Sequence, residues 1–370
     1  MEKMKVGVIG CGNISEIYLK NLTSVFENTE VAAVTDIDSQ RAKERAKQFG
    51  ISYIAKSNQE LIHMDNINIV VILTNPDQHY SICKEAILAG KNVYVEKPLA
   101  LELDQGEELV KLAKSKNVRL CCAPDTLLGA NVQTVRKLID DGWIGRPVGC
   151  HAHLLYSGSE SWHPNPEFLY KYGAGPLFDV GPYYCAGISY LLGCITDVAA
   201  MGKITFPKRK ITSQPLYGKQ IDVEVPTFLT CSMKTEKDVM VNMILTFDVQ
   251  DTNFGSYKME IYGDEGTITM DAPPFFDGKV LYKKRGWEEW TEIPTMFCYK
   301  ENGRGVGVAD MASAILHNRA HRLSSDMAYH TLEIMHSILK AQESGKTIHL
   351  TSRYCRSTEL PLNLALGEMD

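Results

Sequence analysis

The first 120 residues of the chain alternate between short apolar runs and amphipathic segments. Runs rich in β-branched residues, such as those at 5–9, 30–35 and 67–73, are each followed by a stretch with the apolar spacing of a helix. This alternation is typical of a parallel sheet that is covered by helices on both faces. We therefore expect an α/β fold whose ligand lies at the carboxyl ends of the strands.

A different pattern begins near residue 124. After one amphipathic helix, several segments alternate between apolar and polar residues, which indicates a mostly antiparallel sheet. The 370 residues also exceed what one hydrophobic core usually organises. We predict a doubly wound Rossmann domain at 1–124 and, at 125–370, an α+β domain with an open, mostly antiparallel sheet and C-terminal helices.

Composition and residue spacing exclude several classes of function. The 39 Lys and Arg against 45 Asp and Glu create no basic field for a nucleic acid. No apolar stretch approaches the ~18 residues of a membrane helix, and no secretion signal follows Met1. The ten cysteines lack zinc or redox spacing. We expect a soluble cytoplasmic protein without a metal, a nucleic-acid partner or a membrane partner.

The turn after the first strand has the spacing of a dinucleotide-binding loop. Gly10 and Gly12 let backbone amides approach a pyrophosphate at the start of the next helix, and Asn13 and Ile14 complete the turn. Asp36 ends the second strand 24 residues after Gly12. A carboxylate there accepts the ribose hydroxyls of NAD and repels a 2′-phosphate. We predict NAD as the cofactor; a tight turn and a solvated aspartate are the structural alternatives.

A second strand end offers further candidate contacts for the cofactor. Thr74, Asn75 and Pro76 follow the run at 67–73, and they either line the nicotinamide ribose or simply begin the next helix. His79 lies early in that helix. It is a candidate cofactor contact, with a surface or capping histidine as the alternative.

The segment VYVEKPLA at 93–100 ends another apolar run. It delivers Glu96 and Lys97 to the same edge of the sheet, where both are candidates to contact the cofactor. Pro98 disfavours helical geometry at Lys97. Partial burial would lower the pKa of the Lys97 ammonium, so that Lys97 could bind a substrate hydroxyl and share its proton. A surface salt bridge is the alternative.

Together, the turn GCGNIS, Asp36, the loop TNPDQH and the segment VEKPLA resemble the Gfo/Idh/MocA family of NAD(P)-dependent oxidoreductases. The resemblance extends to residues 173–184, GAGPLFDVGPYY, which are similar to the family's glycine-rich segment with its active-site aspartate, here Asp179. The family usually has a histidine four residues later, where this chain has Tyr183. The resemblance implies hydride transfer at a carbinol carbon, most often of a sugar, inositol or related polyol, by a homo-oligomer.

The missing histidine leaves the catalytic base open. The base must lie about 2.6–3.2 Å from the reacting hydroxyl. The pKa of a free tyrosine is ~10, so we expect the Lys97 ammonium to stabilise the Tyr183 phenolate while Asp179 orients the substrate. Lys97 alone, or with His163 in the segment SWHPNP, is the alternative. Tyr183, Asp179 and His163 also have purely structural interpretations, as packed or turn residues.

Three residues are candidate substrate contacts besides Asp179 and Tyr183. Trp162 and His163 precede the glycine-rich segment, and Arg304 lies in a glycine-rich lead into the C-terminal helix. The resemblance favours NAD-dependent oxidation of a ring hydroxyl, such as C3, of a neutral hexopyranose or intact glycoside. The competing interpretations are an NADPH-dependent reductase of a keto-sugar or dihydrodiol-type substrate and a non-catalytic nucleotide-binding sensor.

Overall fold

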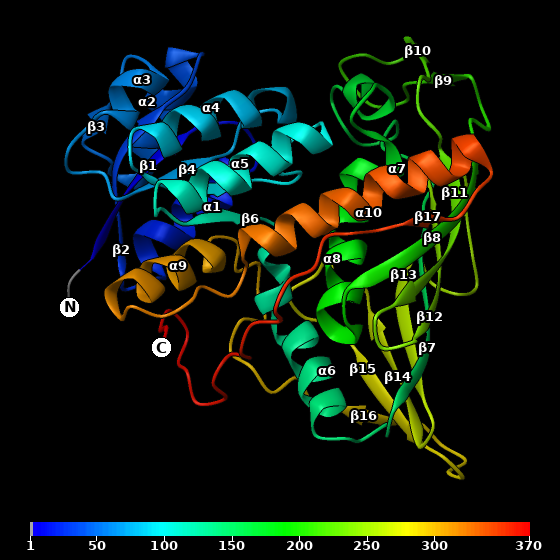
Figure 1. The fold of residues 1–370 in the computed structure, drawn as a ribbon. Coiled ribbons are helices and arrows are strands. Elements are labelled where there is room, and N and C mark those ends of the chain that lie inside the picture. Colours follow the sequence, from blue (N-terminus) through cyan, green and yellow to red (C-terminus); the bar gives the residue numbers. More distant parts are fainter. Residues whose placement is uncertain (1–2) are drawn as a thin grey trace. The chain divides into compact units, whose positions relative to one another are not determined.

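The computed structural model describes residues 3–370, which divide into two compact units (Figure 1). The first unit comprises the chain up to Gln133 together with Met296–Leu332 and Arg353–Asp370. The second comprises Thr134–Thr295 and Glu333–Ser352. The boundary at residue 124 remains a prediction for the start of the second domain, and two later segments fold with the first unit.

The first unit contains a six-stranded sheet in the order β3-β2-β1-β4-β5-β6, and every pair in it is parallel. Helices lie on both faces of the sheet (Figure 1). The order reverses between β1 and β4, which is where doubly wound sheets bind ligands. The prediction of a Rossmann sheet is confirmed. The helices and strands of the first unit are β1 (Met4–Ile9), α1 (Ser15–Ser24), β2 (Thr29–Thr35), α2 (Ser39–Phe49), β3 (Tyr53–Ile54), α3 (Asn58–Ile62), β4 (Ile69–Ile72), α4 (Pro76–Leu88), β5 (Asn92–Val95), α5 (Leu103–Ser115), β6 (Leu120–Cys122), a 3-10 turn (Asp125–Leu128) and α9 (Val306–Leu316).

Local sequence explains where the helices of this unit begin and end. Asp38 caps α2, since its carboxylate accepts the Gln40 N–H at 3.0 Å. The same helix ends at Gly50, whose φ of +67° suits a residue without a side chain. Helix α4 has Pro76 in its first turn, where a missing N–H leaves no helical hydrogen bond unmade.

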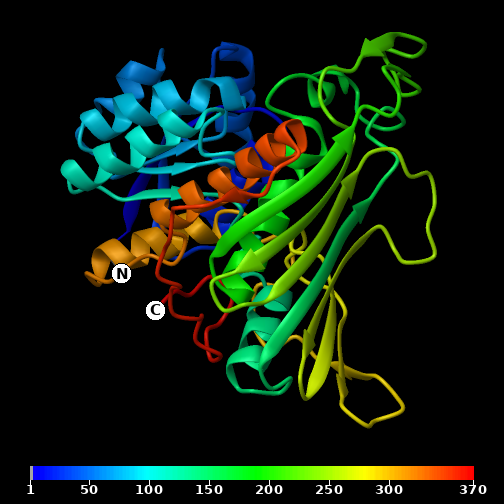
Figure 2. The same ribbon diagram turned by 45° about the vertical axis from the view of Figure 1, so that its right-hand side comes forward.

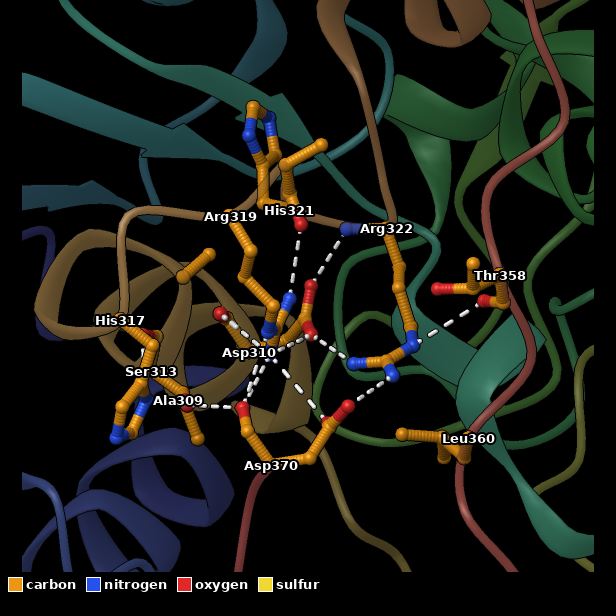
Figure 3. Close-up of polar contacts among 12 residues, drawn as sticks. Ala309, Asp310, Ser313, His317, Arg319, His321, Arg322, Thr358, Leu360 and Asp370 are labelled. Atoms are coloured by element: carbon orange, nitrogen blue, oxygen red, sulfur yellow. Dashed lines mark hydrogen bonds and ion pairs between the residues drawn. The ribbon is translucent and has the colours of Figure 1, made fainter.

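A buried ion cluster ties α9 to the last segment of the first unit (Figure 3). Asp310, on α9, is 1% exposed. Its carboxylate lies 2.6 Å from the Arg322 guanidinium and 2.8 Å from that of Arg319. Arg322 reaches the Asp370 carboxylate at 2.8 Å as well. Asp310 and Arg322 are therefore paired away from water, which is the condition under which buried ions are tolerated, whereas Arg319 and Asp370 are partly exposed.

Removal of one partner from this cluster should be costly. We expect Asp310→Ala to lower the free energy of unfolding by about 3–5 kcal/mol, because it leaves the buried Arg322 guanidinium with only the partly exposed Asp370 carboxylate and removes the acceptor of the Arg322 N–H. Urea unfolding measures the change. The control is Glu107→Ala, which removes an ion pair to Lys111 whose side chains are 51% and 70% exposed; its effect should stay below about 1 kcal/mol. Equal effects of the two variants would contradict this account.

The second unit contains a nine-stranded sheet in the order β16-β15-β14-β13-β7-β12-β11-β8-β17. The β7–β12 pair is parallel and the other pairs are antiparallel, so the predicted mostly antiparallel sheet is confirmed. The elements that lie wholly or mainly in this unit are α6 (Ala130–Asp140), β7 (Pro147–Leu155), a 3-10 turn (Glu167–Tyr170), α7 (Gly175–Asp179), α8 (Gly181–Leu192), β8 (Ile195–Lys203), β9 (Lys208–Lys210), β10 (Gln220–Asp222), β11 (Phe228–Thr235), β12 (Met240–Thr246), β13 (Tyr257–Gly263), β14 (Gly266–Asp271), β15 (Val280–Lys284), β16 (Thr291–Ile293), α10 (Ser325–Ser344) and β17 (Ile348–His349). The strands β9 and β10 form a separate small sheet.

The two faces of the nine-stranded sheet differ (Figure 2). One face packs against α8, all of whose residues are buried, and a Cβ on Gly181 would lie 3.3 Å from the Leu245 side chain. The opposite face exposes Met201, Met240 and Tyr262, which are 78%, 57% and 36% exposed. Successive side chains along a strand point to opposite faces of the sheet, which separates the side chains that face α8 from the exposed ones.

Residues 3–370 have three features that bear on the expectations from composition. No helix in this range is long and apolar enough to cross a membrane. No group of three or more His, Cys, Asp or Glu side chains in it is placed to hold a metal ion. The ten cysteines form no disulfide with one another, and eight of them are buried.

Candidate functional site

The turn between β1 and α1 leaves room for a ligand. Gly10 has φ +100°, and a Cβ there would lie 2.8 Å from the Leu73 backbone, so this position needs glycine. A Cβ on Gly12 would meet no atom within 4 Å. The cap residue of α1, Ile14, offers its helix no side-chain hydrogen bond. The amide end of α1 and the space at Gly12 thus suit a pyrophosphate.

Asp36 is fixed directly beside this turn. One carboxylate oxygen accepts the backbone N–H of Cys11 at 2.6 Å, and the other accepts that of Asp38 at 2.7 Å. The carboxylate oxygens keep further lone pairs for ribose hydroxyls. Ile37 is fully exposed beside it, a feature that the sequence motifs did not single out. The turn and Asp36 together fit NAD.

Asp36 should determine the choice of cofactor. We expect Asp36→Ser to reduce the preference for NAD over NADP at least tenfold, because it removes both the acceptor for the ribose hydroxyls and the negative charge that repels a 2′-phosphate. Fluorescence titration with each reduced cofactor measures the two dissociation constants. Asp38→Asn is the control, since an amide oxygen can still cap α2. An unaltered preference in Asp36→Ser would contradict this assignment.

His79 links two loops at the carboxyl edge of the sheet. Its side chain is fully buried, so the surface alternative is wrong. Its Nδ1 lies 2.7 Å from the Pro98 carbonyl oxygen and its Nε2 lies 3.1 Å from that of Thr74. Burial lowers the pKa of this imidazole. His79 therefore lies between the loop at 74–76 and the one that follows Lys97, and its neutral ring, with one N–H, can donate to only one of these carbonyls. The Asn75 side chain is exposed, and contact of His79 and Asn75 with the cofactor stays a prediction.

Glu96 is a buried anchor for the backbone at Lys97. It is 8% exposed, and its carboxylate accepts hydrogen bonds from the Tyr18 hydroxyl at 2.8 Å and from the Lys97 N–H at 2.9 Å. The Tyr18 and Tyr94 hydroxyls lie 3.1 Å apart, and burial raises the pKa of both phenols. Sequence reasoning missed the two tyrosines, which look like ordinary core residues in their helix and strand. A contact of Glu96 with the cofactor remains a prediction.

Arg304 lies close enough to the buried carboxylate of Asp125, in the first unit, for its charge to act on it. Asp125 is 2% exposed and accepts the Gly305 N–H at 2.7 Å. Burial raises the pKa of Asp125 to about 6, and the Arg304 charge opposes that rise. The Arg304 carbonyl accepts a hydrogen bond from the Asn21 amide at 2.8 Å. These bonds fix the start of α9, and a substrate contact of Arg304 remains a prediction.

The second unit holds the other candidate catalytic residues. Asp179 ends α7 and Tyr183 lies in the first turn of α8, with Val180 between the two helices. Tyr257, on β13, lies within electrostatic reach of Asp179. Burial raises the pKa of Tyr257 to about 12, and the nearby Tyr156 and Asp179 add to that rise. Sequence reasoning missed Tyr257 and Tyr156, although strand alternation places Tyr257 on the same face as buried Met259.

His163 is poorly arranged to act as a base. Its Nδ1 accepts the backbone N–H of Asn165 at 3.0 Å, so the neutral ring carries its proton on Nε2. Neither nitrogen can then take a proton from a substrate unless that bond breaks. Trp162 is 61% exposed and its indole N–H donates to the Tyr156 hydroxyl. Lys97 belongs to the first unit, whereas His163 and Tyr183 belong to the second.

Both units are similar to domains of a known protein family. Residues 4–123 match the profile described as an oxidoreductase family with an NAD-binding Rossmann fold, and residues 132–269 match the Gfo/Idh/MocA C-terminal domain. The chain is 24% identical over 349 residues to inositol 2-dehydrogenase from Burkholderia lata, covering 92% of this chain and 95% of that protein.

Two further proteins show how far the likeness extends. The chain is 27% identical over 203 residues to the oxidoreductase YrbE of Bacillus subtilis, covering 54% of this chain and 58% of that relative's length. The solved structure of levoglucosan dehydrogenase without ligand has a TM-score of 0.83 at 19% identity and covers 96% of this chain and 100% of that one. At this identity the likeness concerns the fold. With the turn and Asp36 in place, the two profile matches show that the chain belongs to the Gfo/Idh/MocA family of NAD-binding oxidoreductases.

Proposed function

We propose that the protein is an NAD-dependent dehydrogenase that oxidises a secondary ring hydroxyl, at C3, of a neutral hexopyranose or intact glycoside. The observation that carries the proposal is that the rings of Tyr257 and Tyr156 lie 6.3 Å apart, with Tyr257 close enough to Asp179 to be affected by its charge, so that two phenols and a carboxylate could bind sugar hydroxyls. The names of two similar proteins, inositol 2-dehydrogenase and levoglucosan dehydrogenase, support a polyhydroxylated substrate.

The proposed chemistry assigns one role to each residue. When bound, NAD supplies the acceptor for the hydride that leaves the carbinol carbon. Lys97 donates a hydrogen bond to the reacting hydroxyl, and the phenolate form of Tyr183 takes the hydroxyl proton as the hydride leaves. Asp179 accepts a hydrogen bond from a neighbouring hydroxyl and so orients the ring. The hydrogen bond that occupies His163 Nδ1 favours this pair over a histidine base.

Two substitutions test these roles. We expect Lys97→Ala and Tyr183→Phe each to lower kcat by about 100-fold or more, because each removes a group that shares the proton in the transition state. The assay follows NADH absorbance with a panel of sugars and glycosides. NADH binding by fluorescence should change little in Tyr183→Phe. Lys116→Ala, at the exposed end of α5, is the control for loss of a lysine.

Two results would overturn the assignment. Unchanged turnover in Lys97→Ala would discard the mechanism. Absence of NADH, together with absence of any oxidised sugar by mass spectrometry across the panel, would favour the non-catalytic sensor. The NADPH-dependent reductase is disfavoured by Asp36, whose carboxylate stands where a 2′-phosphate would have to lie.

We also propose that the protein assembles into a homo-oligomer through the exposed face of the nine-stranded sheet. Met201 and Met240 lie 78% and 57% exposed on that face, and large exposed apolar side chains on a flat sheet favour association with a copy. Light scattering should give a mass above that of one chain, and Met201→Lys with Met240→Lys should reduce it. A monomeric mass for the unmodified protein would contradict this proposal.

A further inference from the structure

Six aromatic side chains of the second unit form a continuous row. Phe275 and Tyr257 have ring centroids 5.3 Å apart, and those of Tyr257 and Tyr156 are 6.3 Å apart. The Trp162 indole N–H donates to the Tyr156 hydroxyl. The ring centroids of Trp162 and His163 are 5.4 Å apart, and those of His163 and Phe168 are also 5.4 Å apart. We call the following side chains the aromatic row: Phe275, Tyr257, Tyr156, Trp162, His163 and Phe168.

One part of the aromatic row is polar and adjoins the candidate substrate residues. Tyr257 lies within electrostatic reach of Asp179, and Tyr156 lies beside Tyr257. Carboxylate and phenol oxygens are suited to the hydroxyls of a sugar ring. A sugar bound at Asp179 would therefore have the rest of the row as its neighbour.

The other end of the aromatic row is apolar and exposed. Trp162 is 61% and Phe168 is 54% exposed. The Trp162 N–H is already bonded to Tyr156, and His163 Nδ1 already accepts the Asn165 amide. This end therefore offers a ligand mainly the faces of its aromatic rings. A second sugar would need hydrogen-bonding partners there, whereas a flat apolar group needs only the rings.

Buried polar contacts hold this exposed end in place. The guanidinium of Arg209, which is 9% exposed, forms ion pairs with Glu160 and with Asp248, the latter at 2.9 Å. It also donates to the Ser157 carbonyl at 3.0 Å. The Ser213 hydroxyl donates to the backbone carbonyl of His163 at 2.6 Å. The loop that carries Trp162 and Phe168 is thus anchored to strands of its own unit, so little conformational entropy is lost when it binds a ligand.

We propose that the aromatic row binds the flat apolar aglycone of a glycoside whose sugar ring lies at Asp179. This inference rests on the proposed function and narrows its substrate to glycosides with an aromatic or similarly planar aglycone. From Tyr257 to Phe168 the row changes from polar to apolar, which matches the same change along such a substrate; Phe275 lies on the other side of Tyr257. Free sugars, and glycosides whose aglycone is a small alkyl group, would contact only Tyr257 and Tyr156, the polar part of the row.

The test compares two glycosides that share a sugar. Isothermal titration calorimetry in the presence of NADH measures the dissociation constants of phenyl β-D-glucopyranoside and methyl β-D-glucopyranoside. We expect the phenyl compound to bind about tenfold more tightly, the size of one good aromatic contact. In Trp162→Ala and in Phe168→Ala the ratio should fall towards one. Tyr217→Ala, which removes a 61% exposed tyrosine outside the row, should keep the wild-type ratio.

The possible results separate this inference from the proposed function. Equal binding of the two glucosides, or a ratio that Trp162→Ala leaves unchanged, overturns the aglycone site even if methyl glucoside is oxidised. Phenyl binding that depends on Trp162 without any oxidised product supports the site and contradicts the dehydrogenase. A lower mass of Trp162→Ala in light scattering, with the ratio unchanged, would instead show that the row joins two copies of the chain, and would also overturn the inference.

Discussion

The hydrogen bond from the Cys11 amide to the Asp36 carboxylate is the interaction on which the cofactor site depends. It joins the turn after β1 to the end of β2 at 2.6 Å, so that one contact positions both the amides that we expect to bind the pyrophosphate and the acid that we expect to bind the ribose. Parallel pairing of the two strands brings these ends together. The geometry of the site therefore follows from the sheet itself rather than from a mobile loop.

The other loops at the same edge depend on buried polar residues. His79 lies between the carbonyls of Thr74 and Pro98, and the Glu96 carboxylate accepts a hydrogen bond from the Lys97 N–H. In the second unit Arg209 plays the corresponding part for the loop that carries Trp162. In both units, side chains that touch no ligand hold in place the side chains that do so in our proposals, which is how precise sites are usually supported.

Much of the fold follows from sequence pattern. The apolar runs of the first 120 residues and the alternating segments after residue 124 predicted both sheets. Helix α8 was missed because all of its residues are buried, so it has no polar face to reveal its period. Strand β8 was missed because Gly202 and two alanines weaken its alternation. For the site, motifs found the glycines, Asp36 and Lys97. The sequence does not indicate the roles of Tyr18, Tyr156 and Tyr257, because these roles come from tertiary contacts between distant segments.

The central claim is that hydride moves from C3 of a sugar ring to NAD. It is tested most directly with a glucopyranoside that carries deuterium at C3, followed by mass spectrometry of the reduced cofactor. The account predicts that NADH gains one deuterium and that the sugar product loses it. Reduced cofactor without deuterium would place the oxidation at another carbon, and a sugar that keeps its deuterium with no NADH formed would contradict the dehydrogenase itself.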